Sequence, residues 1–427
     1  MPGRSSQEMP QIVILGAGFA GLEAAHALRG VKAQVTLVDR NPYSLFQPLL
    51  YQVATGLVQP DVVATPITQI AKGQKNLTIV EGDVIGIDRS KGRVELRAGA
   101  SIAYDRLIIA TGARAHWFDQ PHFARHAQPL KTLEDAETIR AGLNGLARSL
   151  RQRRNAGEGM SKARIAIVGG GPTGVETAGA LIDQTRRFGR ALFGPGLKTQ
   201  TEILLLEAGG HLLPGYGKRA AQNATRTLQR RGVTVRCAAP VTDIGPGGLA
   251  VAGERQEADL VLWTAGVAAT PAADWLGVTA LASGRIEVAS SLALPDDERV
   301  FIAGDVAAVE GVPGLAPAAK QMGRHAGKQA WASLTGRKVR RFRYRDMGEM
   351  AVIADGAAIA RIGPATLTGE AAWAAWLAVH LYFLPDPARQ AEAAAAMIAR
   401  AAVNPEPALA RLPKPVAAHI RSLLRGS

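Results

Sequence analysis

Short apolar runs rich in β-branched residues alternate with alanine-rich stretches along the chain. The run Ile12–Leu15 is followed by a glycine-rich segment, Gly16–Gly21, and then by the alanine-rich stretch Leu22–Leu28. A short apolar run, a turn and a longer alanine-rich stretch predict a strand, a turn and a helix. The pattern therefore predicts an α/β unit at the start of the chain.

The same pattern occurs a second time. The apolar run Ile165–Val168 precedes the turn Gly169–Gly174 and the helical stretch Val175–Ile182. In a GxGxxG turn, the first glycine permits the sharp turn, the second lets the backbone approach a pyrophosphate, and the third lets the helix press on the strand. The helix N-terminus adds free N–H groups for the phosphates. The turn glycines expected to contact dinucleotides are Gly16, Gly18, Gly21, Gly169, Gly171 and Gly174.

Each unit also has a carboxylate at the end of its next predicted strand. Asp39 lies 18 positions after Gly21, close to the spacing of about 20 at which an acid meets the ribose hydroxyls. Glu207 lies 33 positions after Gly174, and we expect an inserted loop around 185–200 to account for the surplus. A carboxylate there accepts hydrogen bonds from the ribose diol and repels a 2′-phosphate. The second unit is therefore predicted to bind NADH in preference to NADPH.

The composition narrows the chemistry. The chain has 427 residues, which suggests two or three domains, and its 47 glycines show no three-residue period, which excludes a collagen-like chain. Its only cysteine, Cys237, excludes an internal disulfide, a CxxC redox pair and an all-cysteine metal site. We expect Cys237 to be structural and expect no metal site. Any redox chemistry must therefore come from a bound cofactor.

Charge and the chain ends bear on location. The formal net charge of +14 favours anionic partners, namely nucleotides, nucleic acid or an acidic membrane surface. The first ten residues contain no apolar signal core, so we expect the protein on the cytoplasmic side. The longest apolar stretch, Ala371–Leu384, has 14 residues, fewer than the roughly 18 to 20 that a spanning helix needs. We therefore expect no segment that crosses a bilayer.

Two dinucleotide units 153 positions apart suit one enzyme that holds a flavin and a nicotinamide face to face. In this arrangement, and in Tyr104–Gly112 and Val300–Asp305, the chain resembles the two-dinucleotide flavoprotein superfamily. Within it the chain resembles the type II NADH dehydrogenases, which are single-chain NADH:quinone oxidoreductases of the membrane surface. The segments that carry this resemblance are Leu45–Gly56, Leu130–Ala136, Gly169–Glu176, Trp263–Val267 and Phe342–Gly348.

The resemblance implies an α/β fold with two Rossmann-like dinucleotide-binding domains, the NADH domain being inserted into the FAD domain. We expect the FAD domain at 1–120 and 286–345, and the NADH domain at 121–285 with its core at 163–268. A C-terminal helical segment at 346–427 is expected to lie at a membrane surface or in a homodimer contact. The resemblance places such a protein peripherally at the cytoplasmic face of the inner or cell membrane, or in the cytoplasm if the tail does not anchor it.

The implied activity is oxidation of NADH by bound FAD and transfer of the electrons to a quinone in a respiratory chain, without proton pumping. Hydride transfer between stacked rings needs no nucleophile, and no Ser/His/Asp arrangement is visible. The remaining cofactor contacts implied by the resemblance are Thr111, Gly112, Gly304 and Asp305 for FAD, and Ala265 and Gly266 in the NADH unit. The quinone is implied to meet Ala316, Lys320 and Gln321, with Gln321 bonded to a carbonyl oxygen.

Glu176, two positions after Gly174, is the candidate to bond the nicotinamide side or to relay a proton. The alternative role of Glu176 is to stabilise the N-terminus of its helix through its negative charge, without a part in catalysis. Two departures from the family stand out: Pro42–Ser44 replaces a common Asn and His, and Pro385–Pro387 interrupts the chain where the family has an amphipathic anchor. A basic, alanine-rich tail follows that interruption.

Two segments indicate how the protein meets its surroundings. Trp373, Trp376, His380 and Phe383 recur at helical spacings, which predicts an aromatic helix face for a bilayer interface, with core or dimer packing as the alternative. The basic run Arg337–Arg345 contains Phe and Tyr, a pattern that can also bind RNA. Because part of the run matches the dehydrogenase family, we favour anionic lipid or structural ion pairs over nucleic acid.

Two other functions compete with the quinone reductase. The first is a soluble NAD(P)H diaphorase or ferredoxin-type reductase that has kept both nucleotide sites but uses another acceptor. The second is a flavoprotein without turnover that recruits a partner when NADH binds. The intact glycine turns and both acids favour an enzyme.

Overall fold

The computed structural model describes residues 9–156, 162–193, 201–384, 390, 391, 393 and 394. The chain folds into two compact units. Unit 1 comprises residues 1–44, 65–114 and 267–347, and unit 2 comprises residues 45–64, 115–266 and 348–427. Each unit contains one of the two predicted glycine turns. The residue limits that the sequence predicts for the FAD and NADH domains stay a prediction, because they are defined by cofactor binding.

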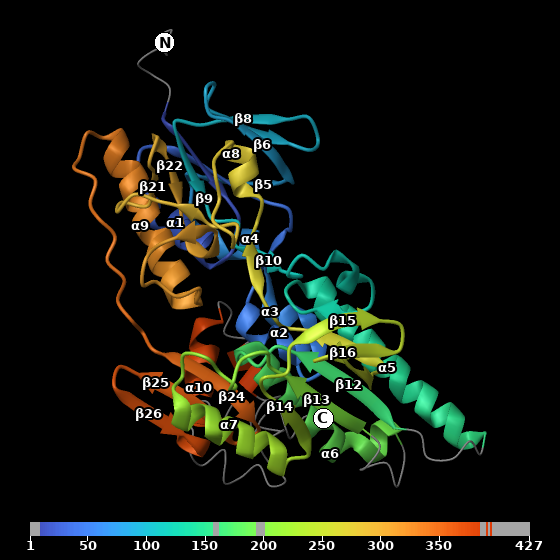
Figure 1. The fold of residues 1–427 in the computed structure, drawn as a ribbon. Coiled ribbons are helices and arrows are strands. Elements are labelled where there is room, and N and C mark those ends of the chain that lie inside the picture. The colour runs from blue at the N-terminus through green and yellow to red at the C-terminus, as the bar shows by residue number, and fades with distance from the viewer. Residues whose placement is uncertain (1–8, 157–161, 194–200, 385–389, 392, 395–427) are drawn as a thin grey trace. The chain divides into compact units, whose positions relative to one another are not determined.

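Unit 1 is built on a six-stranded sheet in the order β21-β22-β9-β1-β2-β5 (Figure 1). Its strands are β1 (Gln11–Leu15), β2 (Gln34–Asp39), β5 (Leu77–Glu81), β9 (Arg106–Ile109), β21 (Ala293–Leu294) and β22 (Asp297–Ile302). All are parallel to their neighbours except β21. The last four residues of β1, Ile12–Leu15, are buried, as expected for a parallel strand covered on both faces. Both strands predicted beside the first turn are confirmed.

Two helices of unit 1, α1 (Phe19–Ala27) and α9 (Ala316–Leu334), pack closely on one another. A Cβ at Gly323 of α9 would lie 1.9 Å from the Ala20 carbonyl oxygen of α1, so only glycine fits there. The shorter helices of the unit are α4 (Ile67–Ile70), α8 (Ala272–Leu276) and the 3₁₀ turn η4 (Gly304–Val306), and its small strand pair is β20 (Ile286–Glu287) with β23 (Ala307–Ala308). The dipeptide Gly304-Asp305 lies against the start of α1. A Cβ at Gly304 would lie 3.2 Å from Ala20 Cβ.

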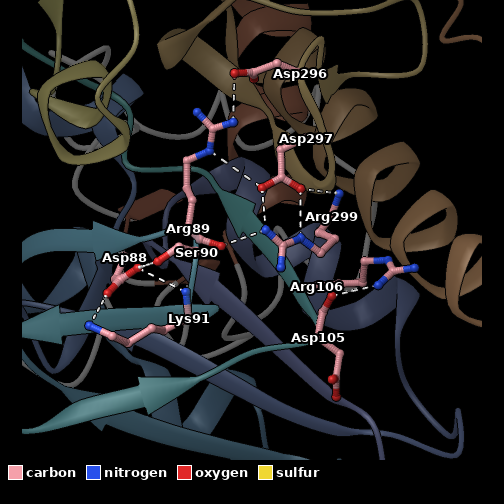
Figure 2. A network of polar contacts seen from close by, with 9 residues as sticks. All are labelled: Asp88, Arg89, Ser90, Lys91, Asp105, Arg106, Asp296, Asp297 and Arg299. Carbon is pink, nitrogen blue, oxygen red and sulfur yellow. Dashed lines mark hydrogen bonds and ion pairs between the residues drawn. The ribbon is translucent and has the colours of Figure 1, made fainter. Parts of the chain in front are cut away.

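An antiparallel meander, β6 (Val84–Asp88), β7 (Arg93–Leu96) and β8 (Ser101–Ala103), extends unit 1. Ion pairs join its first turn to β22 (Figure 2). Arg89 bonds Asp296 at 2.8 Å, and Arg299 bonds both carboxylate oxygens of Asp297 at 2.9 Å. Arg299 also donates to the Arg89 carbonyl at 2.7 Å. Unit 1 is thus held together by charges as well as by its apolar core.

Unit 2 contains a parallel five-stranded sheet in the order β11-β18-β12-β13-β14. Its strands are β11 (Gln128–Pro129), β12 (Ala163–Val168), β13 (Thr201–Leu206), β14 (Val233–Arg236) and β18 (Leu260–Trp263). Its helices include α2 (Leu50–Ala54), α3 (Pro60–Val63), α5 (Leu133–Asn155), α6 (Pro172–Phe193) and α7 (Lys218–Arg230), and an antiparallel sheet is formed by β15 (Val241–Gly245), β16 (Gly248–Val251) and β17 (Glu254–Glu257). The α/β class with two Rossmann-like sheets is confirmed.

The prediction of a loop around 185–200 is wrong for residues 185–193, which belong to α6. The helix α6 continues to Phe193, because no glycine or proline stops it after Ile182 until Gly189, and Gly189 is tolerated within the helix. Residues 194–200 lie outside the described residues. The extra length between Gly174 and Glu207 is therefore largely helix.

The C-terminal region begins with a sheet that the sequence analysis did not predict. The strands β24 (Glu349–Ala354), β25 (Ala357–Ile362) and β26 (Ala365–Thr368) are antiparallel and precede the helix α10 (Gly369–Phe383). A Cβ at Gly179 of α6 would lie 1.7 Å from the Ile353 carbonyl oxygen, so β24 lies directly on α6. The predicted basic tail lies outside the described residues. No helix in the described part of the chain is both long and apolar enough to span a bilayer.

Candidate dinucleotide and proton-transfer sites

The two glycine turns have the same steric design. Gly16 and Gly169 have φ of +97° and +113°, in the region that favours glycine. A Cβ at Gly16 would lie 2.5 Å from the Ala110 carbonyl oxygen, and one at Gly169 would lie 2.8 Å from the Ala265 backbone nitrogen. The first glycine of each turn thus packs on the segment that follows a neighbouring strand, β9 in unit 1 and β18 in unit 2.

The second and third glycines of each turn differ in the space around them. A Cβ at Gly21 would lie 1.7 Å from the Gly16 carbonyl oxygen, and one at Gly174 would lie 1.8 Å from that of Gly169, so both third glycines are sterically required. A Cβ at either second glycine, Gly18 or Gly171, would have no atom within 4 Å. The protein's own packing does not require glycine there. An open surface above a bare backbone at the start of a helix fits a pyrophosphate in both units.

Both predicted acids bind their turn through backbone N–H groups. Asp39 accepts hydrogen bonds from Ala17 N at 2.6 Å and Asn41 N at 2.9 Å. Burial raises the pKa of Asp39, although these two bonds oppose the shift. The carboxylate therefore fixes the turn, and its contact with a ribose stays a prediction.

Glu207 repeats this arrangement in unit 2. It accepts hydrogen bonds from Gly170 N at 2.7 Å and Gly209 N at 2.6 Å. The residue after the first glycine and the residue two positions after the acid are the donors in both units. Glu207 thus stands at the position equivalent to Asp39, as its spacing predicts.

The motif residues after β9 and β18 support the turns. Thr111 Oγ1 lies 2.5 Å from Thr270 Oγ1, and Gly112, with φ of +72°, accepts a hydrogen bond from Thr270 N at 3.1 Å. Thr264 Oγ1 donates to the Val168 carbonyl oxygen at 2.9 Å. The sequence analysis did not single out Thr264, although it directly precedes Ala265.

The remaining predicted FAD contact, Asp305, lies in η4 of unit 1. It follows Gly304, whose φ is +77°. Asp305 lines a small cavity together with Arg285 and Gly314. Asp305 therefore borders a small space inside unit 1, and its contact with FAD stays a prediction.

Glu176, the fifth residue of α6, is buried in unit 2. Its Oε1 accepts a hydrogen bond from Val352 N of β24 at 3.2 Å. Burial raises the pKa of Glu176 to about 8, and the bond from Val352 opposes this only in part. The side chain is therefore mainly protonated at neutral pH, in contrast to an exposed charge that merely complements a helix end.

A cavity of about 10 Å³ for the centre of a water molecule lies beside Glu176. Side chains from four elements of unit 2 line it, among them Tyr51, Gln52, Asp355, Trp373 and Trp376. Tyr51 and Gln52 belong to a family segment for which the sequence predicted no role, and the two tryptophans were expected at a bilayer interface, with core or dimer packing as the alternative. The contact between α2, α6, β24 and α10 that brings these residues together depends on the unpredicted sheet.

The predicted quinone residues lie along the start of α9 in unit 1, where Ala316 is the first helical residue. Lys320 Nζ lies 3.5 Å from the Glu23 carboxylate of α1. Gln321 donates from Nε2 to the Arg345 carbonyl oxygen at 2.9 Å and accepts from Arg345 N at 3.0 Å. Both polar side chains therefore have protein contacts, and a quinone contact would share Gln321 with the backbone at Arg345.

The basic run has no regular secondary structure and forms hydrogen bonds with α9. Besides Gln321, Gln329 accepts from Arg340 N at 2.7 Å, and the His325 ring bonds the Arg340 carbonyl at 3.0 Å. Gln321, His325 and Gln329 are spaced by four residues, so they share one face of α9. We call residues 337–345 the basic strap. Its basic side chains are all exposed, and they are Arg337, Lys338, Arg340, Arg341, Arg343 and Arg345.

The aromatic face of α10 is divided: Trp376 and His380 pack inward, as in the alternative of core packing, whereas Phe383 is exposed. Trp376 is 1% exposed and stacks on His380, with ring centroids 4.2 Å apart. His380 in turn meets Phe46 edge-on, and burial lowers the His380 pKa to about 4. The apolar side chains that α10 does expose are Val379, Tyr382 and Phe383, with Tyr382 78% exposed.

Cys237 directly follows β14 and is partly buried. Burial raises the pKa of its thiol, with a smaller contribution from Glu207. A thiol that stays protonated is a poor nucleophile, which agrees with the expected structural role.

Comparison with known proteins agrees with this arrangement. Residues 10–323 match the model of the pyridine nucleotide-disulphide oxidoreductase family. The chain is 34% identical to the type II NADH:quinone oxidoreductase Ndh of Mycobacterium tuberculosis over 392 residues, which cover 88% of this chain and 84% of that protein. It is 30% identical to the demethylphylloquinone reductase NdbB of Synechocystis sp., with coverage of 88% and 92%.

The fold also matches a solved structure. The structure of NDH2 from Plasmodium falciparum in complex with NADH is similar with a TM-score of 0.82 and 16% identity, and the match covers 92% of this chain and 98% of that one. At this identity the similarity concerns the fold. It extends over both Rossmann-like sheets.

Proposed function

This chain belongs to the type II NADH:quinone oxidoreductases, and from that premise we propose how its own residues carry out the reaction. It is an FAD-dependent enzyme that oxidises NADH and reduces a quinone. The observation that carries the residue assignment is the pair of matched turns, each with a second glycine open to a ligand and a carboxylate bonded to the turn. We assign the turn of unit 1 to FAD and that of unit 2 to NADH.

In unit 1, Gly16, Gly18 and Gly21 and the N-terminus of α1 would hold the FAD pyrophosphate, and Asp39 would accept from the ribose. Thr111, Gly112, Gly304 and Asp305 would complete this site. When bound, FAD supplies a ring that takes up two electrons and passes them on. The protein's own task is to orient the dinucleotides and to exclude water.

In unit 2, Gly169, Gly171 and Gly174 with α6 would hold the NADH pyrophosphate, and Glu207 would accept from the adenosine ribose. Ala265 and Gly266 follow β18 beside the same turn. The negative charge of Glu207 disfavours a 2′-phosphate, so we propose NADH rather than NADPH as the substrate.

We propose that Glu176 holds a proton that the two-electron reduction of a quinone consumes. Quinone reduction to a quinol takes up two protons, so the enzyme needs a donor that is protonated near pH 7. A pKa of about 8 meets that requirement, because the carboxyl both carries the proton at neutral pH and releases it at low cost.

We further propose that Gln321, with Ala316 and Lys320, contacts the quinone. Gln321 also holds the basic strap, so the test must separate the two roles. Gln329, two turns farther along the same face of α9, holds the strap as well and is the matched control. Gln321→Ala should lower quinone reduction about tenfold and leave NADH:ferricyanide turnover within about twofold. Gln329→Ala should lower neither by that amount.

Equal losses of quinone and ferricyanide turnover in Gln321→Ala would remove the quinone role of Gln321. So would a loss of quinone reduction in Gln329→Ala as large as that in Gln321→Ala, because loosening of the strap would then account for both results.

We propose that the enzyme acts peripherally at the cytoplasmic face of the membrane and that the basic strap binds its anionic surface. All six basic side chains of the strap are exposed. None of them forms an ion pair with another residue in the described ranges. A row of basic side chains near a membrane is attracted at about 1 kcal/mol per charge. The exposed Tyr382 and Phe383 of α10 supply apolar contacts suited to the interface.

A further inference from the structure

In the wall of the cavity beside Glu176, two buried polar atoms have no hydrogen-bond partner among the described residues. They are Gln52 Oε1, from a side chain that is 2% exposed, and Trp376 Nε1, from one that is 1% exposed. The first is an acceptor and the second is a donor. Leaving a buried polar group unpaired costs about 1–3 kcal/mol, and native interiors carry few such groups. The pair therefore indicates a missing partner that both donates and accepts.

Both side chains line the cavity beside Glu176. This cavity offers about 10 Å³ to the centre of a water molecule, close to the roughly 10–15 Å³ that a single buried water needs. A quinone or nicotinamide ring is several times larger. The size of the cavity and the polarity of its wall thus point to the same occupant.

The Glu176 carboxyl completes the set of partners. Its Oε1 accepts from Val352 N, and its Oε2 has no partner among the residues that the structure describes. A buried water usually makes about three hydrogen bonds to groups that are otherwise unsatisfied. Trp376, Gln52 and Glu176 supply that number.

We propose that this cavity holds one ordered water molecule, which accepts a hydrogen bond from Trp376 Nε1, donates one to Gln52 Oε1 and makes its third to Glu176. When Glu176 is protonated, its O–H donates to the water. When Glu176 is ionised, the second hydrogen of the water donates to the carboxylate. One water therefore serves both protonation states with no change in the contacts to Gln52 and Trp376.

The inference deepens the proposed function, because it makes Trp376 a positioning residue for the proton that Glu176 carries. Without the water, the ionised carboxylate would have only the Val352 N–H as a partner. The ionised form would then be less stable, so loss of the water raises the Glu176 pKa further. Tyr216, whose ring lies near enough to be affected by Glu176, donates to the Met350 carbonyl at 3.2 Å and supplies no bond to the carboxyl.

Among the described residues, no cation contributes to the Glu176 pKa, whose causes are burial and the bond from Val352. Asp355 lies in the cavity wall, and Asp183 of α6 pairs with Arg231, so these groups do not supply a positive charge to Glu176. His380, which stacks on Trp376, is neutral at neutral pH because burial lowers its pKa to about 4. The water is therefore the group through which Trp376 acts on Glu176.

Trp376→Phe tests the proposal, because it removes the N–H and keeps an aromatic ring against His380. The matched control is Trp373→Phe, which makes the same change on the same helix and in the same cavity wall. The measurement is the infrared carbonyl band of protonated Glu176 as a function of pH in the resting holoenzyme, assigned with Glu176→Gln. Trp376→Phe should raise the Glu176 pKa by about one unit, and Trp373→Phe by less than about a third of a unit.

An unshifted pKa in Trp376→Phe, or an equal shift in both variants, would overturn the proposal. If Trp376→Phe does not fold, Gln52→Leu removes the acceptor and should raise the pKa in the same direction, and no shift there would overturn it equally. The measurement uses neither NADH nor a quinone. A failure of the proposed electron acceptor therefore leaves the outcome interpretable.

Discussion

At the scale of single residues, Asp39 and Glu207 do two things at once. Each accepts a hydrogen bond from one backbone N–H group of its glycine turn and from one two positions after itself, and each is proposed to meet a ribose. A residue that shapes the turn cannot be exchanged freely, so a change in nucleotide preference at this position also loosens the turn. Nucleotide choice and the structure of the turn are thus linked in one side chain.

Glu207→Gln should narrow the preference for NADH over NADPH about tenfold, because it removes the charge that repels a 2′-phosphate. The amide oxygen can keep one of the two backbone bonds, and KM for NADH should rise modestly. The measurement is kcat/KM with each nucleotide. Glu202→Gln, a change on the same strand at an exposed ion pair with Lys162, is the control and should leave the ratio unchanged. An unchanged ratio in Glu207→Gln would contradict the assignment.

Glu176 should make stability depend on pH. Its pKa is raised from 4.5 to about 8 in the folded protein, so its contribution to stability is fully present below about pH 4.5 and is lost as pH rises toward 8. The slope is at most about 1.4 kcal/mol per pH unit. Denaturant unfolding of Glu176→Gln should show a flatter dependence of the unfolding free energy on pH in this window. The same slope in both proteins would place the Glu176 pKa at its ordinary value.

The sequence located the residues whose roles are local. A turn glycine and the acid that follows it belong to one strand-turn-helix unit, so their spacing carries the prediction, as it did for Gly16 and Asp39. Gln52 and Trp376 lie more than 300 positions apart in the sequence, and they line one cavity because α2 packs on α6 and α10 packs on the sheet that contains β24. No periodicity in either segment encodes that meeting.

At the scale of elements, a network of ion pairs connects the meander to β22 within unit 1 (Figure 2). Asp297 is buried and pairs with Arg299 and Arg89, whereas Asp296 is 62% exposed. Asp297→Asn leaves two arginines without this charge and should destabilise unit 1 by about 2 kcal/mol, a value reduced by the partial exposure of both arginines. Asp296→Asn should cost less than about 1 kcal/mol. Urea unfolding measures both, and equal effects would contradict a specific role for Asp297.

The C-terminal elements show where pattern reading fails. The aromatic spacing in α10 correctly indicated a helix, but Trp376 and His380 of the predicted face pack against the protein, and Phe383 is exposed. Burial by a neighbouring element and burial in a bilayer select the same residues, so the pattern alone does not distinguish them. The sheet of β24, β25 and β26 was missed because its strands are short and rich in alanine, which has no strong strand preference.

At the scale of the whole molecule, the charge of +14 has an identified exposed source in the basic strap. A variant with glutamine in place of Arg337, Lys338, Arg340 and Arg341 should bind vesicles that contain anionic lipid more weakly. We expect the affinity at low salt to fall by roughly tenfold or more. The same variant should keep NADH:ferricyanide turnover, because none of the four residues is assigned to a substrate. Cosedimentation with vesicles measures the binding. Equal binding of both proteins, or binding that does not weaken with salt, would contradict the role of the strap.

The central claim is that one chain holds FAD and NADH on its two matched turns and passes the electrons to a quinone. The flavin absorbance of the purified protein tests it most directly. We predict that anaerobic addition of NADH bleaches the flavin band and that a soluble quinone analogue then restores it at a rate consistent with turnover. A flavin that NADH does not bleach, or a reduced flavin that the quinone analogue does not reoxidise, would contradict the account.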